Sequence, residues 1–398
     1  MANVLLTWEL GAGLGHLMRL KPIAEWLAGH SHSLTLATRD LHRAEAIYAD
    51  TNCQAVQAPF KKGKYEGGFD PPSSFGHVLF NTCFGDTDEL GERVRQWQEL
   101  YREVNPSLVI FDHSPTALLA ARSFDFQRAT IGTGFCCPPP TDPLPVLRTW
   151  RPLEDSQLRQ DEARTLHNVN TVSAAIRQRP LGTLGELYAD VDEVLLATFE
   201  ELDHFPQRAD GEYLGAWPQD SGKVPEWPNG YGPRIFAYLK RFQALPKLIE
   251  HLAQLRMPTI VYSHGVDDHL SEYCAANYPS IRFETQPLNL RRATEECDLA
   301  ILNGTHGTTA AMLLAGKHIL FFPIHLEQRM TAERVARHGA GVVVEPHNAD
   351  AISPAMHQVL VDESLRENAR RFSRQYAERS PELASERIFN RVEALLRS

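Results

Sequence analysis

A glycine-rich stretch with a histidine lies close to the N-terminus. After the apolar run Val4–Trp8 the chain contains Gly11, Gly13, Gly15 and His16. A Gly-rich turn at the carboxyl end of a strand lets the backbone approach a ligand, and a histidine at the start of the next helix then faces that ligand. The spacing departs from the G-x-G-x-x-G pattern of dinucleotide-binding turns, because His16 stands where the third glycine belongs. The stretch therefore predicts a histidine-bearing ligand site, with helix capping as the alternative role of His16.

An aspartate ends a second apolar run, Ser107–Phe111. If the two runs are neighbouring parallel strands, their carboxyl ends meet at one edge, where the Asp112 carboxylate can orient the His16 imidazole. Together the two side chains would form a general base. The alternative role of Asp112 is to cap the helix expected to start near Pro115. His113, the next residue, competes for either role.

A second strand-to-helix turn, rich in small and hydroxyl side chains, lies in the C-terminal half. The apolar run Leu299–Leu302 is followed by Asn303, Gly304, Thr305, His306, Gly307, Thr308 and Thr309. Free backbone N–H groups, threonine hydroxyls and the positive end of the helix dipole favour a diphosphate at such a turn. The segment lacks the Lys-Ser/Thr pair of a P-loop, which argues against an NTPase. A turn with threonine caps and no ligand is the alternative.

A carboxylate and a carboxamide stand side by side further along the chain. Glu327 and Gln328 follow the apolar run His318–Phe322, and their acceptor and donor groups suit the vicinal hydroxyls of a sugar. Alternatively, they only begin a helix. Asp190 and Asp192 have the Asp-x-Asp spacing of a metal site, but they lead into a predicted strand far from both Gly-rich turns. We therefore expect no metal site.

Short apolar runs alternate with helical segments along the whole chain. We expect strands at Val4–Trp8, Leu34–Thr38, Leu108–Phe111, Ala129–Ile131, Val194–Ala197, Arg234–Leu239, Thr259–Tyr262, Ile281–Phe283, Leu299–Leu302, His318–Phe322 and Gly341–Val344. Runs that are apolar on both faces are typical of a buried parallel sheet. The pattern predicts an α/β fold with two Rossmann-like, doubly wound domains.

A loop rich in turn-forming residues, 217–233, marks the domain boundary. The expected parts are an N-terminal domain at 1–217, a C-terminal domain at 218–375 and a terminal helix at 376–398 that crosses back to the first domain. Residues 354–398 have a helical period and predict a pair of terminal helices. Two segments, 59–86 and 136–152, are predicted to be long loops that are either functional or disordered.

The composition excludes several classes of protein. The 398 residues include 40 Lys and Arg against 50 Asp and Glu, so no overall positive field attracts nucleic acid. The six cysteines form no Cys-x-x-Cys pair, which indicates free thiols in a reducing compartment. The N-terminal stretch lacks the apolar core of a signal peptide, and no apolar run is long enough to span a membrane. We therefore expect a cytoplasmic protein, with peripheral membrane contact left open.

Taken together, these motifs resemble the inverting branch of the GT-B glycosyltransferases, which includes natural-product, plant and UDP-glucuronosyl transferases and MurG-type enzymes. The resemblance covers nearly the whole chain. In that family a histidine follows the Gly-rich turn after the first strand and an aspartate from a later strand end orients it; His16 and Asp112 match these positions. The resemblance implies sugar transfer from a nucleoside diphosphate sugar to an acceptor hydroxyl, with His16 as the base and with no metal or other cofactor.

The donor motif of that family is commonly His-Gly-Gly-x-Gly-Thr-Thr followed by Pro-x-x-x-Asp/Glu-Gln. Residues 303–309 and 323–328 occupy these places, so the resemblance implies that they bind the donor. Asn303 stands where the family has its phosphate-binding histidine, and Thr305 replaces a glycine. The contacts to the diphosphate are therefore either altered or supplied by other groups. Candidates for such groups are His306, Lys240 and Arg241.

The remaining expectations also follow from the resemblance. Phe283 and Gln286 lie in a segment similar to the family's nucleobase loop, with a place in the core as the alternative for Phe283. The acceptor side is expected to include Gly13, Gly15, His113 and the loops 59–86 and 136–152. The favoured donors carry uridine or thymidine diphosphate, and the acceptor is unspecified. A nucleotide-sugar hydrolase or 2-epimerase and an inactive nucleotide-sugar-binding subunit are the alternative functions.

Overall fold

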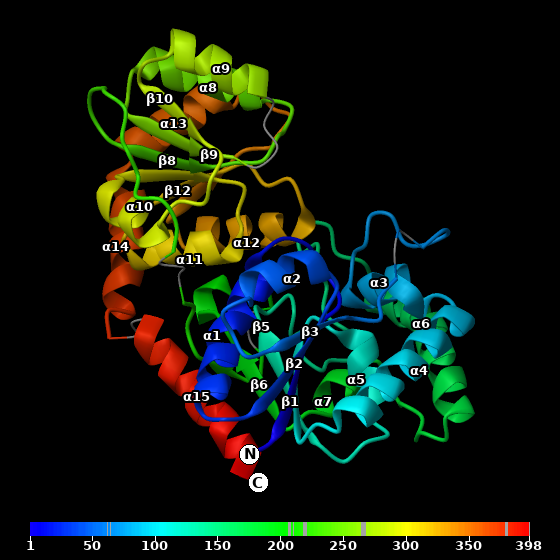
Figure 1. The fold of residues 1–398 in the computed structure, drawn as a ribbon. Helices are drawn as coiled ribbons and strands as arrows, with labels where there is room; N and C mark the ends of the chain where they lie inside the picture. The colour runs from blue at the N-terminus through cyan, green and yellow to red at the C-terminus, as the bar shows by residue number, and fades with distance from the viewer. Residues whose placement is uncertain are drawn as a thin grey trace. The chain divides into compact units, whose positions relative to one another are not determined.

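The computed structural model describes residues 1–61, 63, 65–205, 208–209, 211–217, 221–263, 268–378 and 381–397. The chain divides into two compact units (Figure 1). The first unit contains Met1–Thr198, Phe205–Leu214 and Ser385–Ser398, and the second contains Phe199–His204 and Gly215–Ala384. The predicted domain boundary, between residues 217 and 218, borders residues 218–220, which lie outside the described residues.

A parallel seven-stranded sheet forms the centre of the first unit, with the order β3-β2-β1-β4-β5-β6-β7. Its strands are β1 (Asn3–Trp8), β2 (Ser33–Thr38), β3 (Gln54–Gln57), β4 (Leu108–Asp112), β5 (Gln127–Gly132), β6 (Glu193–Leu196) and β7 (Glu212–Tyr213). The sequence did not predict β3 and β7, because these short edge strands have no fully buried residue and hence no apolar run. β1 pairs with β4 in a register that sets Trp8 beside Asp112.

Helices lie on both faces of this sheet (Figure 1). They are α1 (Gly15–Gly29), α2 (Leu41–Ile47), α3 (Phe75–Leu79), the π-helical turn η1 (Phe80–Phe84), α4 (Thr87–Val104), α5 (Pro115–Ala121), α6 (Asp155–Ala175) and α7 (Glu186–Ala189). The prediction of a loop over 59–86 is wrong for its second half, which forms α3 and η1. Ser74 caps α3 by accepting a hydrogen bond from the His77 N–H, and four apolar side chains of this stretch are buried: Phe75, Leu79, Phe80 and Phe84. Lys62 and Lys64 lie outside the described residues.

The second unit is built on a parallel six-stranded sheet with the order β10-β9-β8-β11-β12-β13. Its strands are β8 (Ile235–Tyr238), β9 (Thr259–Tyr262), β10 (Ile281–Glu284), β11 (Leu299–Leu302), β12 (Ile319–Phe321) and β13 (Gly341–Val343), all at predicted positions. One core cluster joins the sheet to α8 (Leu245–Leu255) and α13 (Ile352–Val361). The other joins it to α10 (Leu290–Glu296), α11 (His306–Leu314), α12 (Leu326–Arg337) and α14 (Glu363–Gln375). Two further elements are the short turn η2 (Glu200–Leu202) and α9 (Asp268–Asn277).

The C-terminal segment forms three helices, α13, α14 and α15 (Pro381–Arg397), where the sequence predicted two. Asp362 separates α13 from α14, because its carboxylate caps α14 by accepting from the Ser364 N–H at 3.0 Å. The end of α15 packs within the first unit, where Phe389 stacks on Trp26 at a ring distance of 5.1 Å.

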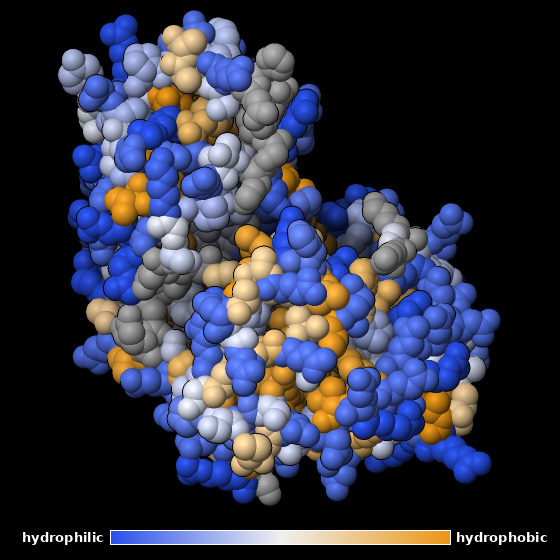
Figure 2. Space-filling view, in the orientation of Figure 1, coloured by the Kyte–Doolittle hydropathy of each residue, from blue (hydrophilic) through white to orange (hydrophobic). Residues whose placement is uncertain are grey.

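Figure 2 shows that hydrophilic side chains cover most of the visible face, while hydrophobic residues gather over parts of the first unit. Among the described residues, no helix combines the length and the apolar character that crossing a bilayer requires.

Candidate active site

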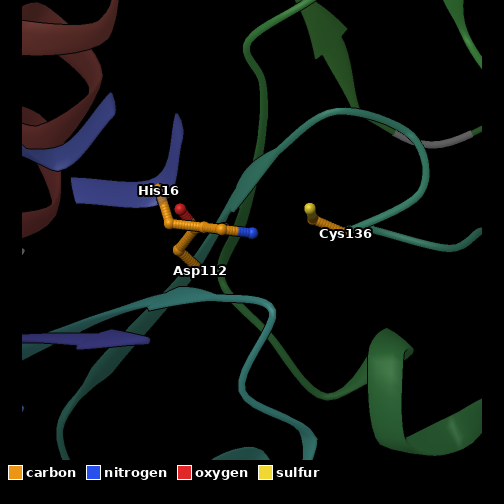
Figure 3. Close-up of side chains that lie close together, drawn as sticks. All are labelled: His16, Asp112 and Cys136. Atoms are coloured by element: carbon orange, nitrogen blue, oxygen red, sulfur yellow. The ribbon is translucent and has the colours of Figure 1, made fainter. Parts of the chain in front are cut away.

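The carboxyl edge of the first sheet brings His16 and Asp112 together, as the sequence predicted. His16 is the second residue of α1, which begins shortly after β1, and Asp112 is the last residue of β4. The His16 Nδ1 lies 2.9 Å from the Asp112 Oδ1, and both side chains are buried (Figure 3). A carboxylate can only accept, so Nδ1 carries the proton and the Nε2 lone pair is left for another group.

The imidazole of His16 is held in one orientation by an indole. The Trp8 ring stacks on the His16 ring at 5.0 Å with an interplanar angle of 15°. The Trp8 indole N–H in turn donates to the Leu10 carbonyl at 2.6 Å. Packing on one side and the carboxylate on the other fix the ring, which a general base requires.

Arg19 completes the group, and the sequence analysis missed it. Its Nη1 lies 2.9 and 3.0 Å from the two Asp112 oxygens. Burial alone would raise the pKa of Asp112, but the positive charge of Arg19 and the hydrogen bond from His16 hold that pKa below its ordinary value. Asp112 is therefore ionised at neutral pH. The signal was present in the sequence, because Arg19 follows His16 by three residues, which places both on one face of a helix.

A thiol also lies near this pair. His16, Asp112 and Cys136 each offer one ligand atom, and these atoms lie within 4.8 Å of one another (Figure 3). The group does not suit a metal cation, because the Arg19 guanidinium contacts both carboxylate oxygens and lies 3.8 Å from the Cys136 sulfur. A second positive charge there would be repelled.

Gly11 lies close against the Nε2 side of the His16 ring. Its φ of +86° is a conformation that favours glycine. A Cβ at this position would lie 2.5 Å from the His16 Nε2, and its three nearest atoms would all belong to His16. A side chain larger than that of glycine would therefore collide with the His16 ring at this position. Gly13 and Gly15 face open space, since a Cβ at either would meet nothing within 4 Å.

His113 lies next to this group without joining it. Burial lowers the pKa of His113 to about 3, so its imidazole is neutral. Its ring centre is 6.2 Å from that of His16. In the part of the chain that the structure describes, the buried His113 Nε2 has no hydrogen-bond partner. His16, not His113, supplies the imidazole that bonds to Asp112.

A buried carboxyl group at the same edge should make stability depend on pH. Burial raises the pKa of Glu9 to about 7, and its Oε2 accepts from the Thr116 N–H at the start of α5. Because the folded-state pKa is raised, the contribution of Glu9 to stability is fully present below its unfolded pKa, and about 3 kcal/mol of it is lost as the pH rises from there through 7. Glu9→Gln should therefore raise the melting temperature at pH 8 and change it little at pH 5. Glu103→Gln, at an exposed position, is the control; equal shifts in both variants would contradict the prediction.

The predicted diphosphate turn precedes α11 in the second unit. Gly307 is exposed, and a Cβ there would meet nothing within 4 Å, so the start of the helix is open. The hydroxyls of Thr305 and Thr309 are buried, and neither has a hydrogen-bond partner among the residues described. Hydroxyls without a hydrogen-bond partner and free backbone N–H groups at a helix N-terminus suit an anionic ligand.

The Asn303 side chain hydrogen-bonds to backbone groups at this edge of the second sheet. Its Oδ1 accepts from the Lys240 N–H at 2.6 Å, and its Nδ2 donates to the Phe322 carbonyl at 2.7 Å. Gly304 has a φ of +99°, and a Cβ there would lie 2.8 Å from the Gln328 carbonyl oxygen. The amide side chain thus ties together the loops after β8, β11 and β12, a role that depends on contacts invisible in the sequence.

The other predicted donor residues lie along the same sheet. Gln328 is buried and its Oε1 accepts from the Ile324 N–H at 3.0 Å, whereas Glu327 is half-buried. Phe283 packs partly against the core, and Gln286 is exposed. Among the remaining candidates, His306 is buried, Lys240 and Thr308 are half-buried, and Arg241 is exposed. Three strand spacings separate β10 from β11, about 14 Å, which a nucleoside diphosphate can span.

The fold is that of the GT-B glycosyltransferases. The chain superposes on the glycosyltransferase of kitacinnamycin with a TM-score of 0.73 and 15% identity, covering 99% of both chains. It superposes on the calicheamicin glycosyltransferase CalG4 with a TM-score of 0.71 and 17% identity, covering 99% of this chain and 98% of the other. It superposes on the glycosyltransferase VinC in complex with DTDP with a TM-score of 0.64 and 16% identity, covering 99% of this chain and 100% of the other.

Curated relatives are named as glycosyltransferases. The chain is 29% identical over 212 residues to the PGL/p-HBAD biosynthesis glycosyltransferase of Mycobacterium tuberculosis (strain ATCC 25177 / H37Ra), covering 50% of this chain and 48% of the relative. It is 27% identical over 212 residues to the PGL/p-HBAD biosynthesis rhamnosyltransferase of Mycobacterium bovis (strain BCG / Pasteur 1173P2), covering 50% and 46%. The chain thus spans about half the length of these relatives. No family model matches it.

Proposed function

We propose that this protein is an inverting glycosyltransferase that moves a sugar from a nucleoside diphosphate sugar to an acceptor hydroxyl. The observation that carries the proposal is the 2.9 Å contact between His16 Nδ1 and Asp112, which leaves the Nε2 lone pair available for an acceptor hydroxyl. The names of the curated relatives and the shared fold support this class of activity.

In the proposed reaction, His16 Nε2 takes the proton of the acceptor hydroxyl. The acceptor oxygen attacks the anomeric carbon and forms a new bond as the bond to the diphosphate breaks, so the configuration inverts. Asp112 stabilises the resulting imidazolium. The diphosphate leaves with its negative charge stabilised by the N–H groups and hydroxyls at the start of α11, and we propose that this needs no metal.

The proposed donor carries uridine or thymidine diphosphate. The structural neighbour VinC is described in complex with DTDP, which supports thymidine as a candidate base. Phe283 and Gln286 are the residues proposed to meet the nucleobase, and Glu327 and Gln328 are proposed to meet the sugar.

Two measurements test the proposed function. A thermal-shift panel of nucleoside diphosphates should identify the base, because a ligand at 100 times its dissociation constant adds about 2.7 kcal/mol of stability. Product analysis with the matching nucleotide sugar and a panel of hydroxylated acceptors should then yield a sugar conjugate of inverted configuration. Free sugar, an epimerised donor or the absence of turnover would instead point to the hydrolase, the epimerase or the inactive subunit.

Thr309→Val should weaken nucleoside diphosphate binding about tenfold or more. The change keeps the shape of the side chain but removes the buried, unpartnered hydroxyl, and hydrogen bonds to charged groups contribute about 1.5–3 kcal/mol. Calorimetry with the nucleoside diphosphate is the measurement. Thr294→Val on α10 is the matched control, because its hydroxyl already donates to the Arg291 carbonyl. Equal affinities in wild type and Thr309→Val would place the diphosphate elsewhere.

A further inference from the structure

A pocket lies at the amino edge of the second sheet, away from the turn proposed to bind the donor. Its wall includes Pro233 before β8, Asp298 before β11 and Lys317 before β12. These three strands are neighbours in the sheet, so their amino ends meet at one edge. The pocket has a volume of about 650 Å³, which is typical of small-molecule sites. The donor turn follows the other end of β11, a strand about 13 Å long.

Four cationic side chains line this pocket: Lys317, Arg366, Arg370 and Arg374. The three arginines follow one another every four residues on α14, so they form a stripe on one face of the helix. Like charges at this spacing repel one another and destabilise a helix. The chain as a whole has a net charge of −10, so such a concentration of positive charge is not a general property of the protein.

Two of the three arginines are paired with glutamates of the same helix. Arg366 Nη1 lies 3.0 Å from a Glu363 carboxylate oxygen. Arg374 Nη2 lies 2.5 Å from a Glu367 oxygen. Glu363 and Glu367 are exposed and do not belong to the described wall of the pocket. These pairs therefore offset two of the four positive charges from outside the pocket.

The other two cations are not neutralised in this way. Among the described residues, neither Arg370 nor Lys317 forms an ion pair with a carboxylate. Lys317 Nζ donates to the Cys297 carbonyl at 2.6 Å, which leaves two of its three hydrogens for other acceptors. Of the described residues in the wall, one carries a carboxylate, Asp298, and this group accepts from the Arg234 N–H at 2.9 Å. The pocket therefore has an excess of positively charged donors.

The C-terminal end of α11 forms another part of the wall and offers an alternative role for the cations, which is to stabilise the last carbonyl groups of that helix. These groups already have partners. The Leu313 carbonyl accepts from the Gly316 N–H at 2.9 Å. The Leu314 carbonyl accepts from the Ser373 hydroxyl at 2.7 Å. A helix end also carries only about half a negative charge, which is too little to balance four cations.

We propose that this pocket binds a small polyanion that carries several phosphate groups. Guanidinium groups form strong, charge-assisted hydrogen bonds with phosphate oxygens. Arg366 and Arg374 are eight residues apart on α14, or about 12 Å along the helix, so an extended chain of phosphates suits the stripe better than a single phosphate. The described wall contains no aromatic side chain, and its larger apolar groups are Pro233 and Leu360. A nucleobase or an acyl chain would therefore find little surface to pack against.

Calorimetric titration with inorganic tripolyphosphate at constant ionic strength tests this proposal. The wild-type protein should show saturable binding. Arg370→Gln and Lys317→Gln should each weaken that binding about tenfold or more, as expected for the loss of one hydrogen bond to a charged group. Arg371→Gln is the matched control, because it makes the same change of charge on the same helix at a residue outside the described wall. Its affinity should stay within about twofold of the wild-type value, since an exposed charge at a distance is screened.

Thr309→Val shows whether tripolyphosphate binds at the donor turn instead. This variant should keep the binding that Arg370→Gln loses, because α11 begins at the carboxyl end of β11 and the pocket lies at the amino end. Arg370 and Arg371 are both exposed, so both glutamine variants should fold, which their melting temperatures check. The lack of saturable binding by the wild-type protein, equal losses in Arg370→Gln and Arg371→Gln, or a loss in Thr309→Val with none in Arg370→Gln would overturn the proposal.

This inference is independent of the proposed function. The described wall of the pocket shares no residue with the proposed donor segments 303–309 and 323–328. Failure of tripolyphosphate binding would therefore leave the glycosyltransferase proposal standing. The absence of sugar transfer would in turn leave the polyanion site standing.

Discussion

Replacement of His16 by alanine is expected to slow sugar transfer by about 10²- to 10⁴-fold, which corresponds to about 3–5 kcal/mol of transition-state stabilisation. The acceptor hydroxyl would then have to lose its proton to water, because the orphaned Asp112 carboxylate is paired with Arg19. Single-turnover rates with saturating nucleotide sugar measure the effect on the chemical step.

Three controls accompany this variant. His16→Ala should retain its fold and its affinity for the nucleoside diphosphate, because α11 belongs to the second unit. Asp112→Asn should slow the same step, and the double variant should be little slower than either single one, as expected when two residues act as a unit. Asparagine is preferred to alanine because it leaves Arg19 an oxygen to bond. A His16→Ala protein that transfers sugar at nearly the wild-type rate would refute the mechanism and make His113 the next candidate.

Gly11→Ala is expected to slow transfer about 10²-fold or more. The added Cβ would lie 2.5 Å from the His16 Nε2, so the imidazole would have to move away from its present position. Misplacement of a reacting group by about 1 Å can cost 10²-fold in rate. The measurement is again the single-turnover rate, together with the affinity for the nucleoside diphosphate, which should persist.

Gly13→Ala is the comparison for this variant. Gly13 has a similar left-handed φ of +96°, but a Cβ there would meet nothing within 4 Å. Both substitutions impose the same kind of backbone strain, so both should lower the melting temperature, and Gly11→Ala should lower it further because of its contact with His16. Only Gly11→Ala should show the large loss of transfer. Equal losses in the two variants would mean that strain in the turn, and not contact with His16, is responsible.

The sequence alone predicted the two parallel sheets and the edges that carry the candidate site. Strands such as β4 and β11 are buried on both faces. Apolar residues on both faces of a strand are needed only in a sheet that is covered on both sides. In a parallel sheet, residues that end neighbouring strands meet at one edge, so the positions of His16 and Asp112 followed from the pattern. The open start of α11 followed in the same way from a strand, a glycine turn and a helix.

Only the tertiary structure decided which atoms meet at those edges. Arg19 binds a carboxylate 93 residues away, and Asn303 accepts from a backbone N–H 63 residues away. The close approach of Gly11 to the His16 ring depends on the positive φ of Gly11, and the ring is also stacked on Trp8. Periodicity reports which face of an element is buried, but side-chain partners distant in the chain are set by register and packing, which local sequence does not specify.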